Sequence, residues 1–205
     1  ARERTAAGLV EPRDARVCKS DRELAGPVVA AACVLPVPLP EDLKALNDSK
    51  QLTHEEREAL YPLILKHALA FGVGVVEVDR IDAINILRAS LEAMAIAFER
   101  CRVLLGRPIQ GAVIDGNMRA PLHDDVVQRT VVSGDALSRP IMAASILAKV
   151  TRDRRMQEEH ERHPGYGFAG HKGYGTPQHL EALARLGPCA QHRRSFAPVR
   201  AALSG

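Results

Sequence analysis

Short apolar runs rich in small and β-branched residues predict four strands in this chain. The first run is followed by a loop studded with prolines, and the second alternates small and β-branched residues, as a strand with one buried face does. Each of the two later runs is followed closely by an aspartate. The predicted strands are residues 25–35, 71–78, 109–114 and 126–132.

Elsewhere, apolar residues recur every three or four positions, which is typical of helices with one buried face. Thr53 and Glu56 have the spacing of a capping box at the start of one helix. Asp79 is expected to cap another, longer helix. The predicted helices are residues 53 to about 70, 79–101, 139–155 and 177–186, and an irregular loop rich in glycine and proline is expected at 164–177.

This succession of strands and helices predicts an α/β fold with helices on both sides of the sheet. A chain of 205 residues fits one domain with a real core. Because aromatic residues make up only 3% and tryptophan is absent, that core must be aliphatic. Hydrophobic residues at 46% and charged residues at 26% exclude disorder of the whole chain.

Membrane, secreted and zinc-bound classes are not expected. Residues 1–16 are charged and lack the apolar core of a signal peptide, and no apolar run is long enough to span a bilayer. We therefore expect a cytoplasmic protein without membrane contact. The four cysteines lie far apart and form no CxxC pair, so free thiols are expected rather than disulfides: Cys18, Cys33, Cys101 and Cys189.

The basic charge lies in the last quarter of the chain. From Thr151 onward there are nine Lys or Arg against five Asp or Glu, whereas the preceding residues carry nineteen against twenty. Five of the eight histidines lie in the same part. This distribution fits a surface that faces phosphates, and a solvated helical face would have the same charge.

Two aspartates stand where predicted strands end. Asp115 lies in the segment Ile114–Asn117 (IDGN), and Asp135 lies in Gly134–Ala136 (GDA). Because strand ends hold oxygen donors in place, such carboxylates are natural ligands for Mg²⁺ or Mn²⁺. Asp115 and Asp135 are therefore the candidate metal ligands. The alternative for each is a strand-end aspartate that caps a turn.

Eight segments, in order and spacing, resemble the bacterial ribonuclease HII family, and they cover nearly everything from Leu24 to Val199. They are LAGPVVAA at 24–31, LNDSKQL at 46–52, IDAINIL at 81–87, IDGN at 114–117, GDA at 134–136, AASILAKVTRDR at 143–154, HKGYGT at 171–176 and HRRSFAP at 192–198.

The resemblance implies a ribonuclease H-like fold, in which a mixed sheet flanked by helices gathers four acidic residues on its surface. It also implies a basic helical C-terminal extension that helps to grip the duplex. We accordingly expect a single domain over residues 1–205, with an atypical segment at 1–23 and the extension at about 156–205.

The family members are endoribonucleases that cut the RNA strand of RNA–DNA hybrids and cut 5′ to a ribonucleotide embedded in duplex DNA. The reaction needs an activated water, charge relief at the phosphate and a stabilised leaving oxygen, which two divalent ions about 3.5–4 Å apart supply. The resemblance therefore implies Mn²⁺ or Mg²⁺ as cofactor. RNA–DNA hybrid and ribonucleotide-containing duplex DNA are the implied partners, and we expect a monomer.

Asp115 and Asp135 match the last two of the family's four carboxylates, which implies that they are metal ligands and catalytic residues. The first two open a DEAGRG segment, and counting back from Ala25 places them at Val17 and Cys18. Val17 cannot bind a metal ion, and Cys18 is a soft donor better suited to zinc or copper than to magnesium. Both expected carboxylates are thus unmatched at these positions.

Three explanations for this mismatch are open. Asp14, Asp21 or Glu23 could substitute through a shifted loop. Alternatively, the chain is a catalytically impaired relative that still binds hybrid duplex. A third explanation is that residues 1 to about 23 reflect a misread or frame-shifted sequence, which the abrupt edge of the resemblance at Leu24 favours.

The resemblance also implies substrate contacts. Tyr174 matches the tyrosine that stacks on the sugar next to the ribonucleotide and helps to distinguish RNA from DNA. Asn47, Ser49, Lys50 and Lys172 are candidates for phosphate contacts, which give affinity without reading sequence. The alternative for each is a surface polar residue without a ligand.

Overall fold

The computed structural model describes residues 6–9 and 23–204. The chain forms two compact units, each assembled from segments that are distant in sequence. Unit 1 comprises residues 1–12, 29–75 and 90–150, and unit 2 comprises residues 13–28, 76–89 and 151–205. No helix in the described ranges is long and apolar enough to cross a bilayer.

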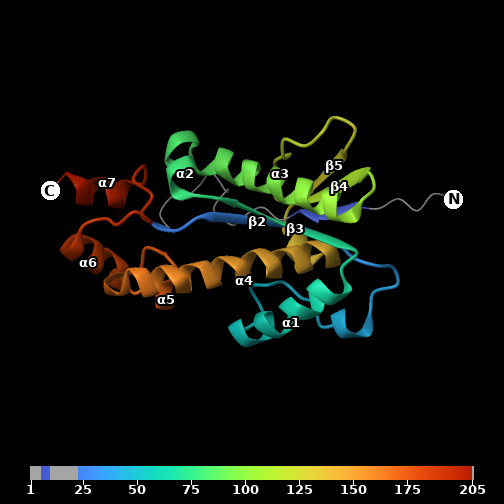
Figure 1. Cartoon of the computed structure of the whole chain (residues 1–205), viewed down its shortest axis with the longest axis horizontal. Helices are drawn as coiled ribbons and strands as arrows, with labels where there is room; N and C mark the ends of the chain where they lie inside the picture. The colour runs from blue at the N-terminus through green and yellow to red at the C-terminus, as the bar shows by residue number, and fades with distance from the viewer. Residues whose placement is uncertain (1–5, 10–22, 205) are drawn as a thin grey trace. The chain divides into compact units, whose positions relative to one another are not determined.

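Unit 1 is built on a five-stranded mixed sheet of order β3-β2-β1-β4-β5 (Figure 1). Strand β1 pairs antiparallel with β2 and parallel with β4, and β4 pairs parallel with β5. The parallel pairs bring the carboxyl ends of β1, β4 and β5 to one edge of the sheet. The strands are β1 Ala6–Leu9, β2 Val28–Val34, β3 Ala70–Val76, β4 Gly111–Asp115 and β5 Val127–Val131.

Helices connect and cover these strands, and further helices make up most of unit 2. The α-helices are α1 His54–His67, α2 Val78–Ile84, α3 Ile86–Leu105, α4 Arg139–Arg162, α5 Phe168–His171, α6 Pro177–Leu186 and α7 Ala197–Leu203. Short 3-10 turns are η2 Glu41–Leu43, η3 Gly134–Ala136 and η4 Pro164–Tyr166.

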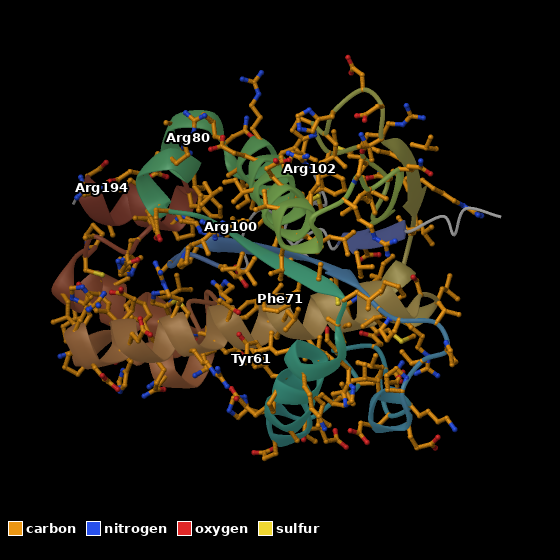
Figure 2. The ribbon with its side chains drawn as sticks, turned by 45° about the vertical axis from the view of Figure 1, so that its right-hand side comes forward. Tyr61, Phe71, Arg80, Arg100, Arg102 and Arg194 are labelled. Atoms are coloured by element: carbon orange, nitrogen blue, oxygen red, sulfur yellow. The ribbon has the colours of Figure 1, made fainter. Side chains whose placement is uncertain are left out.

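Strand β3 shows how the sheet of unit 1 is covered on both faces. Phe71 packs against the buried apolar cluster to which α1 and α4 contribute, as does Tyr61 of α1 (Figure 2). Gly74 points to the opposite face, where a Cβ would lie 1.9 Å from the Ala93 carbonyl oxygen of α3. Alternation between apolar side chains and glycine therefore lets α3 approach the backbone of β3 closely.

The core of unit 2 forms around the segment 23–26, which main-chain hydrogen bonds hold between two other segments. Leu24 N donates to Gly173 O at 2.7 Å, and Gly26 N donates to Gln191 O at 2.8 Å. Arg193 N returns a bond to Leu24 O at 2.8 Å. Leu24 packs with residues of α6 and α7, and Ala25 packs with residues of α4, η4, α5 and α6.

Most predicted elements are confirmed, with small shifts at their ends. The four predicted strands correspond to β2–β5. The Thr53 capping box is present at the start of α1, and α6 spans the predicted residues. The predicted free thiols are confirmed at Cys33, Cys101 and Cys189, whereas Cys18 lies outside the described residues.

The helix predicted from Asp79 is wrong in two respects. The N-cap of α2 is Glu77 rather than Asp79. Asn85 then separates α2 from α3 with a φ of 70°, which cannot continue a right-handed helix.

Other departures concern element ends and short elements. The helix predicted at 139–155 continues to Arg162, and the predicted irregular loop contains η4 and α5. The sequence pattern did not indicate β1 or α7. The expected single domain and its boundary near residue 156 stay predictions.

Candidate active site

Asp115 and the segment containing Asp135 meet at the carboxyl ends of β4 and β5. In the parallel register, Asp115 lies opposite Val131, and η3 follows β5 after a short turn. Gly134 N donates a hydrogen bond to Asp115 Oδ1 at 2.7 Å. A Cβ on Gly134 would lie 2.6 Å from Ile141 Cδ1 and 3.3 Å from Asp115 Oδ1, so the glycine allows this close approach.

Asp135 is buried, with only 2% of its surface exposed. One carboxylate oxygen, Oδ2, forms an ion pair with Lys50 Nζ, whose side chain is 26% exposed. The other oxygen, Oδ1, is buried and has no hydrogen-bond partner among the described residues. A buried carboxylate oxygen without a partner is costly in free energy and marks a position suited to a cation.

The segment 47–50 is fixed so that Lys50 reaches this carboxylate. Lys50 N donates to Asp48 Oδ1 at 2.9 Å, and the Ser49 hydroxyl lies 2.7 Å from the Ser145 hydroxyl of α4. Arg57 of α1 donates to Ser49 O at 2.8 Å. Ser49 is thus buried as an anchor of the loop, whereas Asn47 is exposed beside it.

The donor set fits a hard divalent cation in part. Asp115 and Asp135 offer carboxylate oxygens, the donors that Mg²⁺ and Mn²⁺ prefer. The described residues nevertheless contain no group of three or more His, Cys, Asp or Glu placed to hold a metal ion. Further donors must therefore come from residues beyond those described, from water or from substrate phosphate.

Strand β1 ends next to β4. Leu9, its last residue, pairs with Ile114, so β1 ends beside the residue before Asp115. Val17 and Cys18, the positions that correspond to the family's first two carboxylates, lie outside the described residues.

Glu23, one of the three residues considered as a substitute ligand, is bound elsewhere. Its Oε2 lies 2.9 Å from Arg152 Nη2 and 3.3 Å from Arg193 Nη2, and all three side chains are buried. Arg193 also donates to the carbonyls of Glu23 and Gly26, at 3.1 and 3.0 Å. Two guanidinium groups thus already neutralise Glu23. Asp14 and Asp21 lie outside the described residues.

Tyr174 and Lys172, the other predicted substrate residues, belong to unit 2. Tyr174 is half-buried, and its main chain bridges antiparallel to Glu23. Lys172 has a φ of 51°, and its carbonyl accepts a bond from Arg152 at 2.9 Å. Arg193, in the same unit, is fully buried, so its role is structural.

Three buried histidines lie in or next to the segment that contains Tyr174. His179 Nδ1 is 2.8 Å from Tyr174 O, and His179 Nε2 is 3.1 Å from His192 Nε2. His171 stacks on His179 with the ring centroids 4.3 Å apart. Burial lowers the pKa of all three, and the pKa of His192 falls from 6.5 to about 4, with the neighbouring His179 as the second cause.

Sequence reasoning missed several residues that shape these sites. Ser145, Arg57 and the Glu23 ion pairs carried no recognisable signal, because their partners are distant in sequence. Asp82 of α2 accepts hydrogen bonds from Arg194 N at 2.8 Å and Ser195 N at 2.9 Å. It thereby fixes the segment after His192.

Comparison with known proteins identifies the family. The model of the family "Ribonuclease HII" matches residues 23–199. The ribonuclease HII of Xanthomonas axonopodis pv. citri is 52% identical over 182 residues, covering 89% of this chain and 72% of that protein. The ribonuclease HII of Burkholderia ambifaria is 56% identical over 180 residues, covering 88% and 79%.

Solved structures share the fold. The ribonuclease H2 from Pyrococcus horikoshii OT3 superposes with a TM-score of 0.78 at 24% identity, covering 98% of this chain and 97% of that one. Bst-RNase HIII in complex with Mn²⁺ gives a TM-score of 0.74 at 18% identity, covering 98% and 69%. These similarities confirm the predicted ribonuclease H-like α/β fold. Together with the family match and the identities above, they lead to one conclusion: this chain belongs to the ribonuclease HII family.

Proposed function

We propose that this chain is a divalent-metal-dependent endonuclease that cuts 5′ to ribonucleotides embedded in duplex DNA, as well as the RNA strand of RNA–DNA hybrids. Membership of the ribonuclease HII family supports the broader activity, that of a ribonuclease H acting on RNA–DNA hybrids. The observation that carries the proposal is the buried Asp135 carboxylate with its unpartnered Oδ1, held next to the segment that binds Asp115.

Asp115 and Asp135 are the residues that would hold Mn²⁺ or Mg²⁺. Two such ions supply an activated water, charge relief at the phosphate and a stabilised leaving oxygen. The Mn²⁺ in the complex of Bst-RNase HIII, which has the same fold, supports a divalent ion here without deciding between manganese and magnesium.

Lys50 has two roles in this proposal. Its ammonium neutralises Asp135 in the structure described. Since an ammonium on a flexible stem also suits a phosphate oxygen, Lys50 becomes available to the nucleic acid backbone once Asp135 has another positive partner. Ser49 keeps the loop in place through Ser145, and Asn47 is exposed at its start.

Tyr174 is the proposed reader of the ribonucleotide. A tyrosine ring stacked on the sugar can sense the 2′-hydroxyl, which distinguishes RNA from DNA. Lys172 lies two residues before Tyr174 in the sequence. It is the proposed contact for a phosphate group, where its charge adds affinity without specificity.

The alternative is a catalytically impaired relative that binds hybrid duplex but lacks the first two metal carboxylates. The buried Oδ1 of Asp135 favours the enzyme, because a carboxylate oxygen without a partner marks a position suited to a cation.

Cleavage of a duplex with one embedded ribonucleotide tests the main proposal. With Mn²⁺ or Mg²⁺ the chain is expected to nick 5′ to that ribonucleotide. Asp115→Asn and Asp135→Asn should each lower the rate by about 100-fold or more, because each removes a charged metal ligand. Asp124→Asn, an exposed aspartate of the same unit, serves as the control and should leave the rate unchanged.

Binding without cleavage would contradict the proposal that the chain is an enzyme and would support the alternative, a catalytically impaired relative that binds hybrid duplex. In that case the affinity for duplex should still fall steeply with salt concentration, because phosphate contacts release counterions.

A further inference from the structure

The buried histidines of unit 2 form a chain of hydrogen bonds with only one consistent direction. The Tyr174 carbonyl can only accept, so the proton of His179 is on Nδ1. Its Nε2 must then accept from His192 Nε2, which leaves His192 Nδ1 as an acceptor. Cys189 N supplies that acceptor with an N–H at 3.0 Å. Each nitrogen of the two rings thus has a defined role.

This arrangement requires both rings to be neutral. A second proton on His179 would place two N–H groups against each other across the 3.1 Å contact between the two Nε2 atoms. A second proton on His192 would lie on Nδ1, against the Cys189 N–H 3.0 Å away. The surroundings favour neutrality, because His179 and His192 are fully buried and lie against the Phe168 ring, with centroids 5.5 and 5.7 Å away.

The chain of hydrogen bonds ends on the main chain of the residue proposed to read the ribonucleotide. The Tyr174 carbonyl accepts from His179 Nδ1 and also from Thr176 N at 2.8 Å. Tyr174 N donates to His171 O at 2.9 Å. The peptide groups on both sides of the Tyr174 side chain are therefore fixed from within unit 2.

We propose that His179, oriented by His192, is a positioning residue that holds the Tyr174 main chain so that its ring is presented to the ribonucleotide. This inference rests on the proposed function, because it assigns the histidine pair to the specificity of that same site. His179 itself does not touch the nucleic acid. Its effect should therefore appear in discrimination between substrates, and it should be absent when Tyr174 is removed.

Two variants with the same branched side-chain skeleton separate the hydrogen bond from simple packing. His179→Asn keeps an amide N–H near the position of Nδ1, whereas His179→Leu has no donor. Binding is measured in EDTA, so that no strand is cut, with one duplex that contains a single ribonucleotide and one that is all DNA. Thermal unfolding checks that each variant is folded.

The wild type should prefer the ribonucleotide duplex, and His179→Asn should retain that preference. In His179→Leu the ratio of the affinities for the two duplexes should fall by about fivefold to tenfold, which is the effect of one hydrogen bond. In Tyr174→Ala the same leucine substitution should cause no further loss. Retained preference in a folded His179→Leu variant would overturn this inference and leave the proposed function standing. A wild type without preference would overturn the proposed reading of the ribonucleotide, and this inference with it.

The tautomers give a readout that needs no nucleic acid. Nitrogen-15 spectra of the wild-type chain should show the proton of His179 on Nδ1 and that of His192 on Nε2. A proton on Nε2 of His179 would contradict the arrangement directly, whatever the binding experiments show.

The pH dependence of stability follows from the same geometry. The pKa of His192 is about 4 in the folded protein against 6.5 ordinarily, so the folded state binds this proton more weakly than the unfolded chain. The neutral pair therefore makes its full contribution to the free energy of unfolding above pH 6.5, and that contribution decreases as the pH falls to about 4. The other titratable groups facing the pair are His171, His163, Glu159, Cys189 and Tyr166.

Thermal unfolding of the wild type and of His192→Asn tests this dependence. The asparagine keeps an acceptor for Cys189 N but has no ring to protonate. The wild type should unfold at a higher temperature than the variant at about pH 7. This difference in unfolding midpoint should decrease as the pH falls to about 4. A difference that stays constant over this range would mean that protonation of His192 does not disturb the pair.

Discussion

A carboxylate as deeply buried as that of Asp135 must be neutralised, and this requirement organises the candidate active site. The Lys50 ammonium supplies the positive charge, and the loop that carries Lys50 is in turn fixed by the contact of Ser49 with Ser145 of α4. Gly134, next to Asp135, also binds Asp115. Two carboxylates are thus held close together while one oxygen remains unpartnered, which is the electrostatic condition for a divalent cation.

Unit 2 meets a comparable requirement with a different solution. Arg152 and Arg193 are buried, and they share the Glu23 carboxylate and the carbonyls of the segment 23–27. Because each buried guanidinium needs several acceptors, these two side chains fix the main chain on which Tyr174 forms its bridge. The neutral histidine pair also fixes the Tyr174 main chain, through the hydrogen bond from His179 to the Tyr174 carbonyl.

Local sequence patterns could predict strands β2–β5, the capping box of α1 and the whole of α6, because each of these patterns is strong. It could not predict the break at Asn85, where a positive φ in one residue overrides the apolar stripe that continues on both sides. That Asp115 and the segment containing Asp135 follow neighbouring strands was predictable from the sequence pattern. The ion pair between Asp135 and Lys50 and the two ion pairs of Glu23 with arginines were not, since such contacts join residues far apart in sequence and depend on tertiary packing.

A crystal structure of the chain in Mn²⁺, with anomalous scattering to locate the metal, tests whether Asp115 and Asp135 hold the cation. Manganese should be bound to carboxylate oxygens of both Asp115 and Asp135, with Lys50 Nζ moved away from Asp135. Manganese absent from both carboxylates at a saturating concentration, with the ion pair between Lys50 and Asp135 intact, would contradict this assignment.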